Sequence, residues 1–146
     1  MPWTGPILLR DYLDRPGGAQ GGRPDELPPE TPGVYVLSER FWTGEPDKTS
    51  RPWYVGASGN RNPQGRSGLR GRIGNLISSL CGFYGDIAGL HCGGITVSEQ
   101  YCLGNPPRSP LSLWIAWRPM PNATPREVAK EERRLIEMLD PPGNHM

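Results

Sequence analysis

Two short runs of strand-forming residues lie close together in the chain and constrain the fold more than any other feature of the sequence. The first run, GVYVLSE at residues 33–39, alternates valines with Tyr35 and Leu37, which predicts a strand with both faces partly covered. The second run is PWYVGAS at residues 52–58. Because strands this close in sequence most simply pair antiparallel, the two runs predict the centre of a small sheet.

Two helices and a third strand are predicted after these runs. From Leu69 to Leu80 the apolar residues recur at helical spacing, which predicts a helix despite two internal glycines that each cost about 1 kcal/mol relative to alanine. LSLWIAW at residues 111–117 predicts a strand. The TPRE sequence at residues 124–127 combines an N-cap, a proline at the first helical position and a capping-box glutamate, and it predicts a helix that ends at Leu139.

The remaining segments have weaker patterns. Residues 6–14 fit a short amphipathic helix, and residues 15–32 contain too much glycine and proline for regular structure. The glycine-rich stretch 81–110 contains one strand-like run, GITVSEQY. We therefore predict an amino-terminal helix and linker over residues 1–31 and one domain over residues 32–146, with an α+β fold in which helices flank a small, mainly antiparallel three-stranded sheet.

The basic residues are mostly arginine and are concentrated in one part of the chain. Only Lys48 and Lys130 are lysines among the 16 basic residues, and the formal net charge is +1. Residues 51–72 contain five arginines and no aspartate or glutamate. Because a guanidinium group binds phosphate through two parallel hydrogen bonds, this stretch fits a surface that binds a polyanion. A solvated, arginine-rich loop is the alternative.

No stretch approaches the about 20 apolar residues of a membrane span, and the amino terminus lacks the pattern of a signal peptide. A cytoplasmic location without membrane partners is therefore expected. Cys81, Cys92 and Cys102 lack the close paired spacing of zinc knuckles, so we expect reduced cysteines with structural roles. A zinc site made of the three cysteines and His91 is the alternative.

Glu132 lies near the middle of the apolar face of the predicted last helix. The stripe is defined by Val128, Ala129, Leu135, Ile136 and Leu139. Helical geometry turns the neighbouring Glu131 by about 100°, towards solvent. A carboxylate on a buried face costs free energy unless it is paired or holds a metal, so a metal ligand and a buried salt bridge to an arginine both remain open for Glu132.

Several of these features together resemble one enzyme family. Gly33-Val34-Tyr35 followed by Tyr54-Val55-Gly56 is similar to the paired strand motifs that give the GIY-YIG nucleases their name. The next helix carries LRGRIGNL, in which Arg72 stands where the family has its phosphate-binding arginine. Arg70 and Arg72 both flank the apolar stripe, and only the resemblance favours Arg72.

The carboxy-terminal run EERRLIEMLDPPGN resembles the closing pattern of the same family. The matching positions are Glu132, Leu135, Ile136, Pro141 and Asn144. The resemblance covers about residues 32–144. Helical periodicity selects Glu132 over Glu131 independently of it.

The resemblance implies an endonuclease that cuts DNA with one Mg²⁺ or Mn²⁺ held by Glu132. It also implies that Arg72 binds the phosphate and that Tyr35, hydrogen-bonded through Tyr54, orients or deprotonates the attacking water. An ordinary tyrosine has a pKa near 10, so a nearby arginine or metal must lower the pKa of Tyr35 for the second role. Asn144 is expected to support the site by hydrogen bonding.

The sequence departs from the family in two places. Ala57-Ser58 stands where many relatives carry a lysine, and the helix lacks the histidine or tyrosine that often follows the arginine. Tyr84 and His91 are candidate substitutes. Further contacts to nucleic acid are predicted for Arg61, Arg66, Arg70 and His91.

The predicted function is a restriction-like or repair-like DNA endonuclease, which would require a homodimer or two visits to cut both strands. A non-catalytic nucleic-acid-binding module with the same fold is the main alternative, and an arginine-rich protein-interaction module is a third. The sequence leaves open the choice of DNA over RNA, the sequence preference and the oligomeric state.

Overall fold

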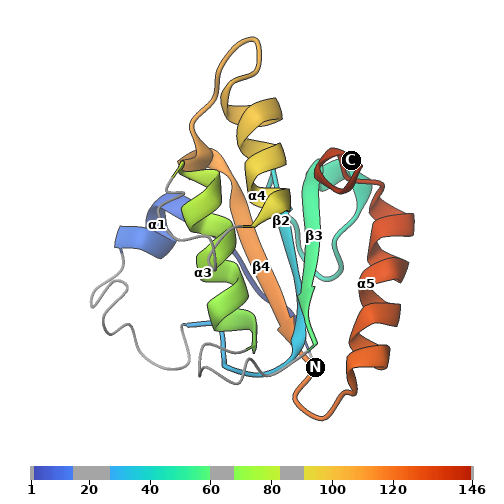
Figure 1. Ribbon diagram of the computed structural model, residues 1–146. Helices are drawn as coiled ribbons and strands as arrows, with labels where there is room; N and C mark the ends of the chain where they lie inside the picture. Colours follow the sequence, from blue (N-terminus) through green and yellow to red (C-terminus); the bar gives the residue numbers. More distant parts are fainter. Residues whose placement is uncertain (1, 15–26, 60–67, 83–90, 146) are drawn as a thin grey trace.

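The computed structural model describes residues 2–14, 27–59, 68–82 and 91–145, and it has a four-stranded antiparallel sheet with helices on both faces (Figure 1). The strands are β1 (Thr4–Leu8), β2 (Gly33–Ser38), β3 (Pro52–Ser58) and β4 (Trp114–Pro119), in the spatial order β1-β4-β2-β3. The helices are α1 (Leu9–Asp14), α3 (Gly68–Leu80), α4 (Cys92–Val97), which continues into the π-helical turn η4 (Ser98–Cys102), and α5 (Pro125–Leu139). Short 3-10 turns are η2 (Lys48–Ser50), η5 (Pro110–Ser112) and η6 (Pro142–Asn144).

Strand β2 lies in the interior of the sheet, and all six of its residues are buried. Side chains alternate between the two faces of a strand. Accordingly, Tyr35 and Leu37 pack in the core beside α3, whereas Val34 and Val36 pack in the core beside α5. The prediction of a strand with covered faces is confirmed, and so is its antiparallel pairing with β3.

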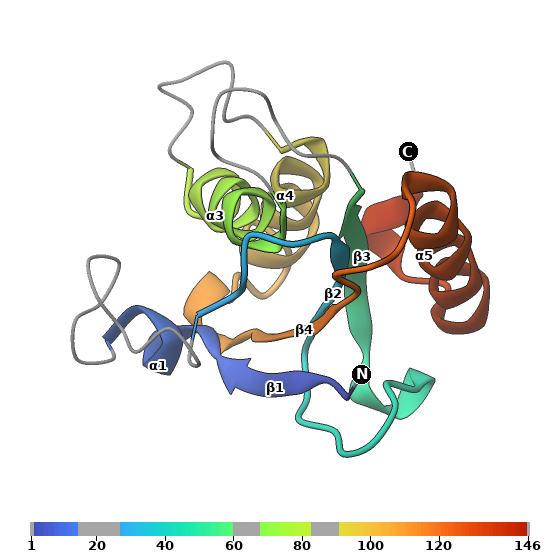
Figure 2. The ribbon, with the colours of Figure 1, turned by 90° about the horizontal axis from the view of Figure 1, so that it is seen from below.

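The helices form two layers, one on each side of the sheet (Figure 2). Helices α3 and α4 cover one face, and α5 lies against the other face next to β3, which is an edge strand. Both long helices were predicted from periodicity, and Thr124 and Glu127 form the predicted capping box of α5. Ala129 is exposed, so the apolar stripe of α5 is narrower than the predicted one.

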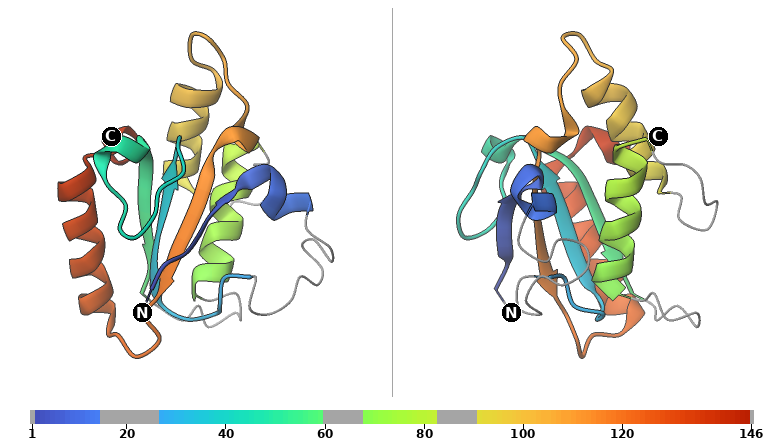
Figure 3. Two further views of the ribbon diagram at one scale, coloured as in Figure 1. Left: turned by 180° about the vertical axis from the view of Figure 1, so that it is seen from behind. Right: turned by 90° about the vertical axis from the view of Figure 1, so that its left-hand side faces the viewer.

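The amino-terminal segment differs from the prediction, because Thr4–Leu8 forms a fourth strand and only Leu9–Asp14 is helical. Strand β1 pairs with β4, with Ile7 opposite Ile115, at the edge of the sheet away from β3 (Figure 3). Leu9 is fully buried in the shared core. The predicted helix over residues 6–14 and the three-stranded sheet are therefore corrected: the hydrogen bonds of a short edge strand come from a partner far along the chain, and local periodicity cannot reveal them.

The strand-like run GITVSEQY is helical in the structure and lies in α4 and η4. Its β-branched residues favour a strand, but Gly94 in the run and Gly93 just before it allow helix α4 to pack closely against its neighbours. A Cβ atom on Gly94 would lie 2.9 Å from the carbonyl oxygen of Leu76 in α3. Tertiary packing thus overrides the local preference. Strand β4 also begins three residues later than predicted, because Ser109 caps the 3-10 turn η5.

Across the described ranges, no helix has the length and apolar character needed to cross a membrane.

Candidate active site

Four of the predicted catalytic side chains come together at the β3 edge of the sheet. Tyr35 comes from β2, Tyr54 from β3, Arg72 from α3 and Glu132 from α5. His91, which immediately precedes α4, completes the cluster. Burial is the largest influence on the pKa of each of the other four side chains, and the positive charge of Arg72 opposes it at Tyr35, Tyr54 and Glu132 and adds to it at His91. Arg72 therefore lies close enough to interact electrostatically with all four.

Tyr35 is fully buried, and its hydroxyl group is bonded to His91. The distance from its Oη to Nε2 of His91 is 2.6 Å, whereas its ring centroid lies 6.2 Å from that of Tyr54. Burial raises the pKa of Tyr35 well above its ordinary value, and the opposing effect of Arg72 is smaller. Within the described residues Tyr35 bonds to His91 and not to Tyr54, which differs from the expected bond. The charge of Arg72 alone does not meet the condition that the pKa of Tyr35 be lowered for a role as a base.

Two glycines make room for the tyrosine rings. Gly56 lies opposite Tyr35 in the β2–β3 pair, and a Cβ atom on Gly56 would lie 2.2 Å from Cζ of Tyr35. A Cβ atom on Gly93 would lie 2.2 Å from Cε1 of Tyr54. Both distances are far below van der Waals contact, so the ring positions depend on the absence of side chains at these two residues.

Tyr54, Arg72 and Glu132 are partly exposed, in contrast to the buried Tyr35 and His91. Burial raises the pKa of Tyr54 and that of Glu132, and Arg72 opposes both shifts. Within the part of the chain that the structure describes, no donor lies within hydrogen-bonding distance of the Glu132 carboxylate and no cation forms a salt bridge with it. A buried salt bridge therefore does not account for Glu132 in the described structure.

Glu131, rather than Glu132, forms the salt bridges of this helix. Its carboxylate lies 3.3 Å from Arg118 and 2.5 Å from Arg134, and its side chain is only 17% exposed. Glu131 is thus only partly exposed to solvent, and it is paired with two arginines. Hydrogen bonds and the charges of both arginines outweigh the effect of burial and lower the pKa of Glu131. The two adjacent glutamates therefore have opposite electrostatic environments.

Asn144 holds the carboxy-terminal turn η6 against β3. Its side-chain amide accepts from the N–H of Val55 at 2.9 Å and donates to the carbonyl oxygen of the same residue at 2.8 Å. Because Val55 follows Tyr54 directly, these bonds fix the backbone beside the site. Both the oxygen and the nitrogen of the amide bond to the backbone of β3, in agreement with a supporting role.

The structure distinguishes Arg70 from Arg72, which helical geometry alone could not do. Arg70 donates to the carbonyl oxygen of Pro28 at 2.9 Å and lies 3.7 Å from the Glu30 carboxylate. The predicted nucleic-acid contact of Arg70 thus competes with two contacts inside the chain. Three further candidates lie outside the described residues: Arg61, Arg66 and Tyr84.

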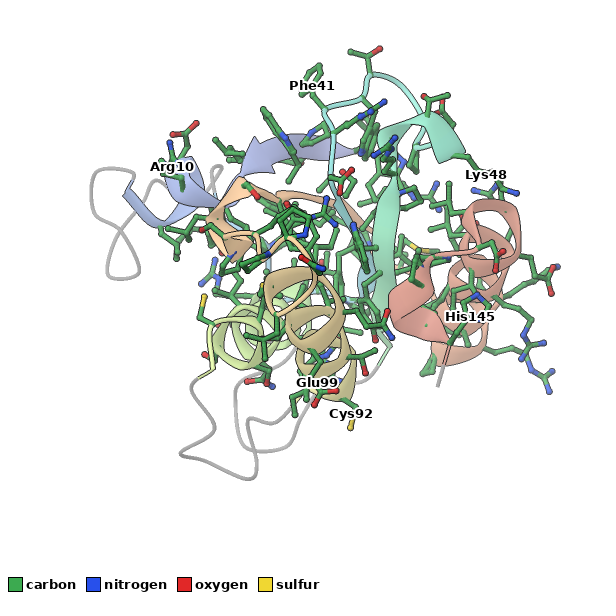
Figure 4. The ribbon with its side chains drawn as sticks, turned by 90° about the horizontal axis from the view of Figure 1, so that it is seen from above. Arg10, Phe41, Lys48, Cys92, Glu99 and His145 are labelled. Atoms are coloured by element: carbon green, nitrogen blue, oxygen red, sulfur yellow. The ribbon has the colours of Figure 1, made fainter. Side chains whose placement is uncertain are left out.

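His91 is fully buried, and both of its ring nitrogens are bonded within the protein. Because His91 is buried, it cannot contact nucleic acid directly in this structure. Because both of its ring nitrogens are already bonded, it cannot also serve as a zinc ligand beside the three cysteines. Cys81, Cys92 and Cys102 are free thiols, and Cys92 projects from α4 on the side away from the sheet (Figure 4).

Among the described residues, no three His, Cys, Asp or Glu side chains gather closely enough to form a metal cage. A cation at this site would rely on the Glu132 carboxylate, with its other positions left to water or to a ligand. This arrangement suits Mg²⁺, which usually takes one or two protein carboxylates and keeps several waters.

No protein family, characterised protein or solved structure matches this chain. The resemblance to the GIY-YIG nucleases stays a prediction that rests on the motifs alone.

Burial of His91 predicts that the protein loses stability in mild acid. Burial and then the charge of Arg72 lower the pKa of His91 to about 3. In the unfolded chain a histidine titrates near pH 6.5, so between about pH 6.5 and pH 3 the unfolded state binds more protons than the native state. Stability therefore falls as the pH falls, by about 2 kcal/mol from this group at pH 5.

Urea unfolding at pH 7 and pH 5 tests this prediction when the native chain is compared with a His91→Asn variant. The acid-induced loss of unfolding free energy should be about 2 kcal/mol smaller in the variant. Other titrating groups, including Glu132, are common to both proteins and cancel in the comparison. An equal loss in both proteins would contradict the assigned ionisation of His91.

Proposed function

We propose that this protein is a metal-dependent endonuclease that hydrolyses phosphodiester bonds in DNA. The observation that best supports the proposal is that Arg72 interacts with two tyrosines and with a carboxylate, Glu132, for which the described residues supply no hydrogen-bond partner, each from a different element of the fold. This set offers a bidentate anion-binding group, a cation ligand and neutral hydroxyls in one place. Phosphodiester hydrolysis requires groups of these kinds.

Arg72 would bind the non-bridging oxygens of the phosphodiester and offset the charge that develops on them. Its planar guanidinium matches two oxygens at once, which a lysine ammonium cannot do. Tyr54 is partly exposed, and burial raises its pKa, so it would act as a neutral hydroxyl that donates to the substrate or orients a water. Tyr35 is fully buried.

Glu132 would hold the Mg²⁺ or Mn²⁺ that the resemblance implies. Its carboxylate is half-buried, and burial raises its pKa, so the charged form gains from a cation that compensates for lost hydration. When bound, the cation supplies charge neutralisation at the phosphate and lowers the pKa of a bound water.

Cleavage of supercoiled plasmid tests the proposal. The purified chain should convert the plasmid to nicked circles with Mg²⁺ or Mn²⁺ and leave it intact with a chelator. Linear product that appears only at high protein concentration would favour a dimer. DNA binding without cleavage under either metal would favour the non-catalytic nucleic-acid-binding module over the endonuclease. If the chain neither bound nor cleaved DNA, both hypotheses would be rejected.

The affinity for nucleic acid, measured at several salt concentrations, distinguishes the two nucleic-acid hypotheses from the protein-interaction module. A surface that neutralises phosphates releases counterions, so its affinity for nucleic acid falls steeply as salt rises. Parallel measurements with single-stranded RNA and duplex DNA of equal length would establish which nucleic acid the protein prefers. A protein-interaction module predicts no salt-dependent affinity for either.

A further inference from the structure

His91 makes four hydrogen bonds in the interior of the protein, one of which is the first bond of helix α4, from the N–H of Ile95 to the carbonyl oxygen of His91 at 3.0 Å. Its backbone N–H donates to Oγ of Ser79 at 2.9 Å, and its Nδ1 accepts from the backbone N–H of Gly94 at 3.0 Å, which caps helix α4. Its Nε2 lies 2.6 Å from Oη of Tyr35. The ring also contacts Tyr54 edge to face, with centroids 5.2 Å apart and an interplanar angle of 76°.

These contacts determine the orientation of the ring. Turning the imidazole by 180° would exchange Nδ1 with Cδ2 and Nε2 with Cε1, so the bonds to Gly94 and Tyr35 would both be lost. Each lost bond would leave a buried polar group unpaired, which costs the full desolvation of that group. The observed orientation is therefore strongly preferred over the flipped one.

The same contacts determine the tautomer. A backbone N–H can only donate, so Nδ1 of His91 must present a lone pair to Gly94. Burial lowers the pKa of His91 to about 3, so at neutral pH the imidazole carries a single proton. With Nδ1 bare, that proton is on Nε2, which faces Tyr35.

We propose that His91 is a positioning residue that acts as a fixed hydrogen-bond donor to Oη of Tyr35, and that it does not act as the base of the site. A donor on one side of Oη forces the hydroxyl proton of Tyr35 to point away from His91. The positive charge of Arg72 also acts on the hydroxyl group of Tyr35. Both His91 and Arg72 present only N–H groups to Tyr35, so the hydroxyl proton of Tyr35 must be accepted by a different group.

Because Tyr35 is fully buried and Tyr54 is partly exposed, the acceptor that fits this arrangement is an oxygen that links Tyr35 to a bound phosphodiester by way of Tyr54, without direct contact between Tyr35 and the nucleic acid. This consequence rests on the proposed function, because it makes Tyr35 a hydrogen-bond donor in the reaction and not the base that deprotonates the attacking water. The tautomer of His91 does not rest on it, since it is a property of the folded protein without ligand.

Nitrogen NMR of the ¹⁵N-labelled chain tests the tautomer directly. Long-range ¹H–¹⁵N correlations should show a protonated Nε2 and a bare Nδ1 for His91 at pH 7, unchanged down to pH 5. The other histidine, His145, is exposed, and a His145→Gln variant removes its signals and assigns those of His91. A proton on Nδ1, a mixture of tautomers or protonation above pH 5 would overturn the proposal.

A double-mutant cycle on plasmid cleavage tests the positioning role. Asparagine is a good N-cap, so His91→Asn keeps the cap of α4, but its shorter side chain cannot also reach Tyr35. We expect His91→Asn and Tyr35→Phe each to lower the cleavage rate about 10- to 100-fold, with no further loss in the double variant. Additive losses, or an unchanged rate in His91→Asn, would overturn the positioning role.

Circular dichroism and urea unfolding of each variant establish that the loss is not a failure to fold. If the native chain does not cleave DNA at all, the proposed function fails, and the NMR measurement still decides whether His91 is a fixed donor.

Discussion

The Glu132→Gln variant is expected to lose about 1,000-fold or more in the rate of plasmid cleavage and to keep the stability of the native chain. Glutamine has the same shape as glutamate but cannot anchor a divalent cation with a charge. Because burial raises the pKa of Glu132, the native fold disfavours its ionised form, and the neutral amide relieves that cost. The cleavage rate should therefore fall while the free energy of unfolding stays the same or rises.

Glu131→Gln provides a matched control on the same helix. Glu131 has a lowered pKa and forms salt bridges with Arg118 and Arg134, so its neutral replacement should reduce stability and leave cleavage largely intact. The two variants differ by one position and remove the same charge. Native-like cleavage by Glu132→Gln, or equal loss of cleavage in both variants, would exclude Glu132 as the cation ligand.

Arg72→Lys and Arg72→Gln are both expected to reduce cleavage by about 100-fold or more, for different reasons. Lysine keeps the positive charge and loses the planar fork. Glutamine loses both, so only Arg72→Gln should raise the pKa values of Glu132 and His91, which the charge of Arg72 lowers in the native chain. The pair thus separates the geometry of phosphate binding from the electrostatic field of the site.

Carbon NMR of the Glu132 carboxyl group and nitrogen NMR of His91 measure these shifts across a pH titration. Arg70→Lys is the control, because Arg70 lies on the same helix and is engaged with Pro28 and Glu30 instead of the tyrosines. If Arg70→Lys reduced cleavage as strongly as Arg72→Lys, the assignment of the phosphate-binding arginine would be wrong. Unchanged pKa values in Arg72→Gln would show that Arg72 does not interact electrostatically with these groups.

Elements whose pattern is complete within the segment were predictable from the sequence. Helix α5 carries its own start signal in Thr124 and Glu127, and the periodicity of α3 places Leu69, Ile73 and Leu76 on one buried face. The buried strand β2 was recognisable because hydrophobic residues occupy both alternating sets of positions. In each case the physical cause of the structure lies within a few residues.

Elements that depend on a distant partner were not predictable. Strand β1 exists because β4 supplies its hydrogen bonds, and α4 is helical because Gly93 and Gly94 let it pack against Tyr54 and α3. Histidine is also an uncommon N-cap, so no local signal marked His91 as the start of a helix. The role proposed for His91 follows only from its hydrogen bonds to Gly94 and Tyr35 in the folded protein.

The sequence by itself determined which residues form the candidate site: the two tyrosines, an arginine and the glutamate on an apolar helix face. Only the tertiary structure decided their chemical states. It distinguished Arg72 from Arg70, placed the salt bridges on Glu131 instead of Glu132, and surrounded Tyr35 so completely that its pKa rises. The physical reason is that residue identity and helical spacing are local, whereas desolvation and hydrogen-bond direction depend on every element packed around a side chain.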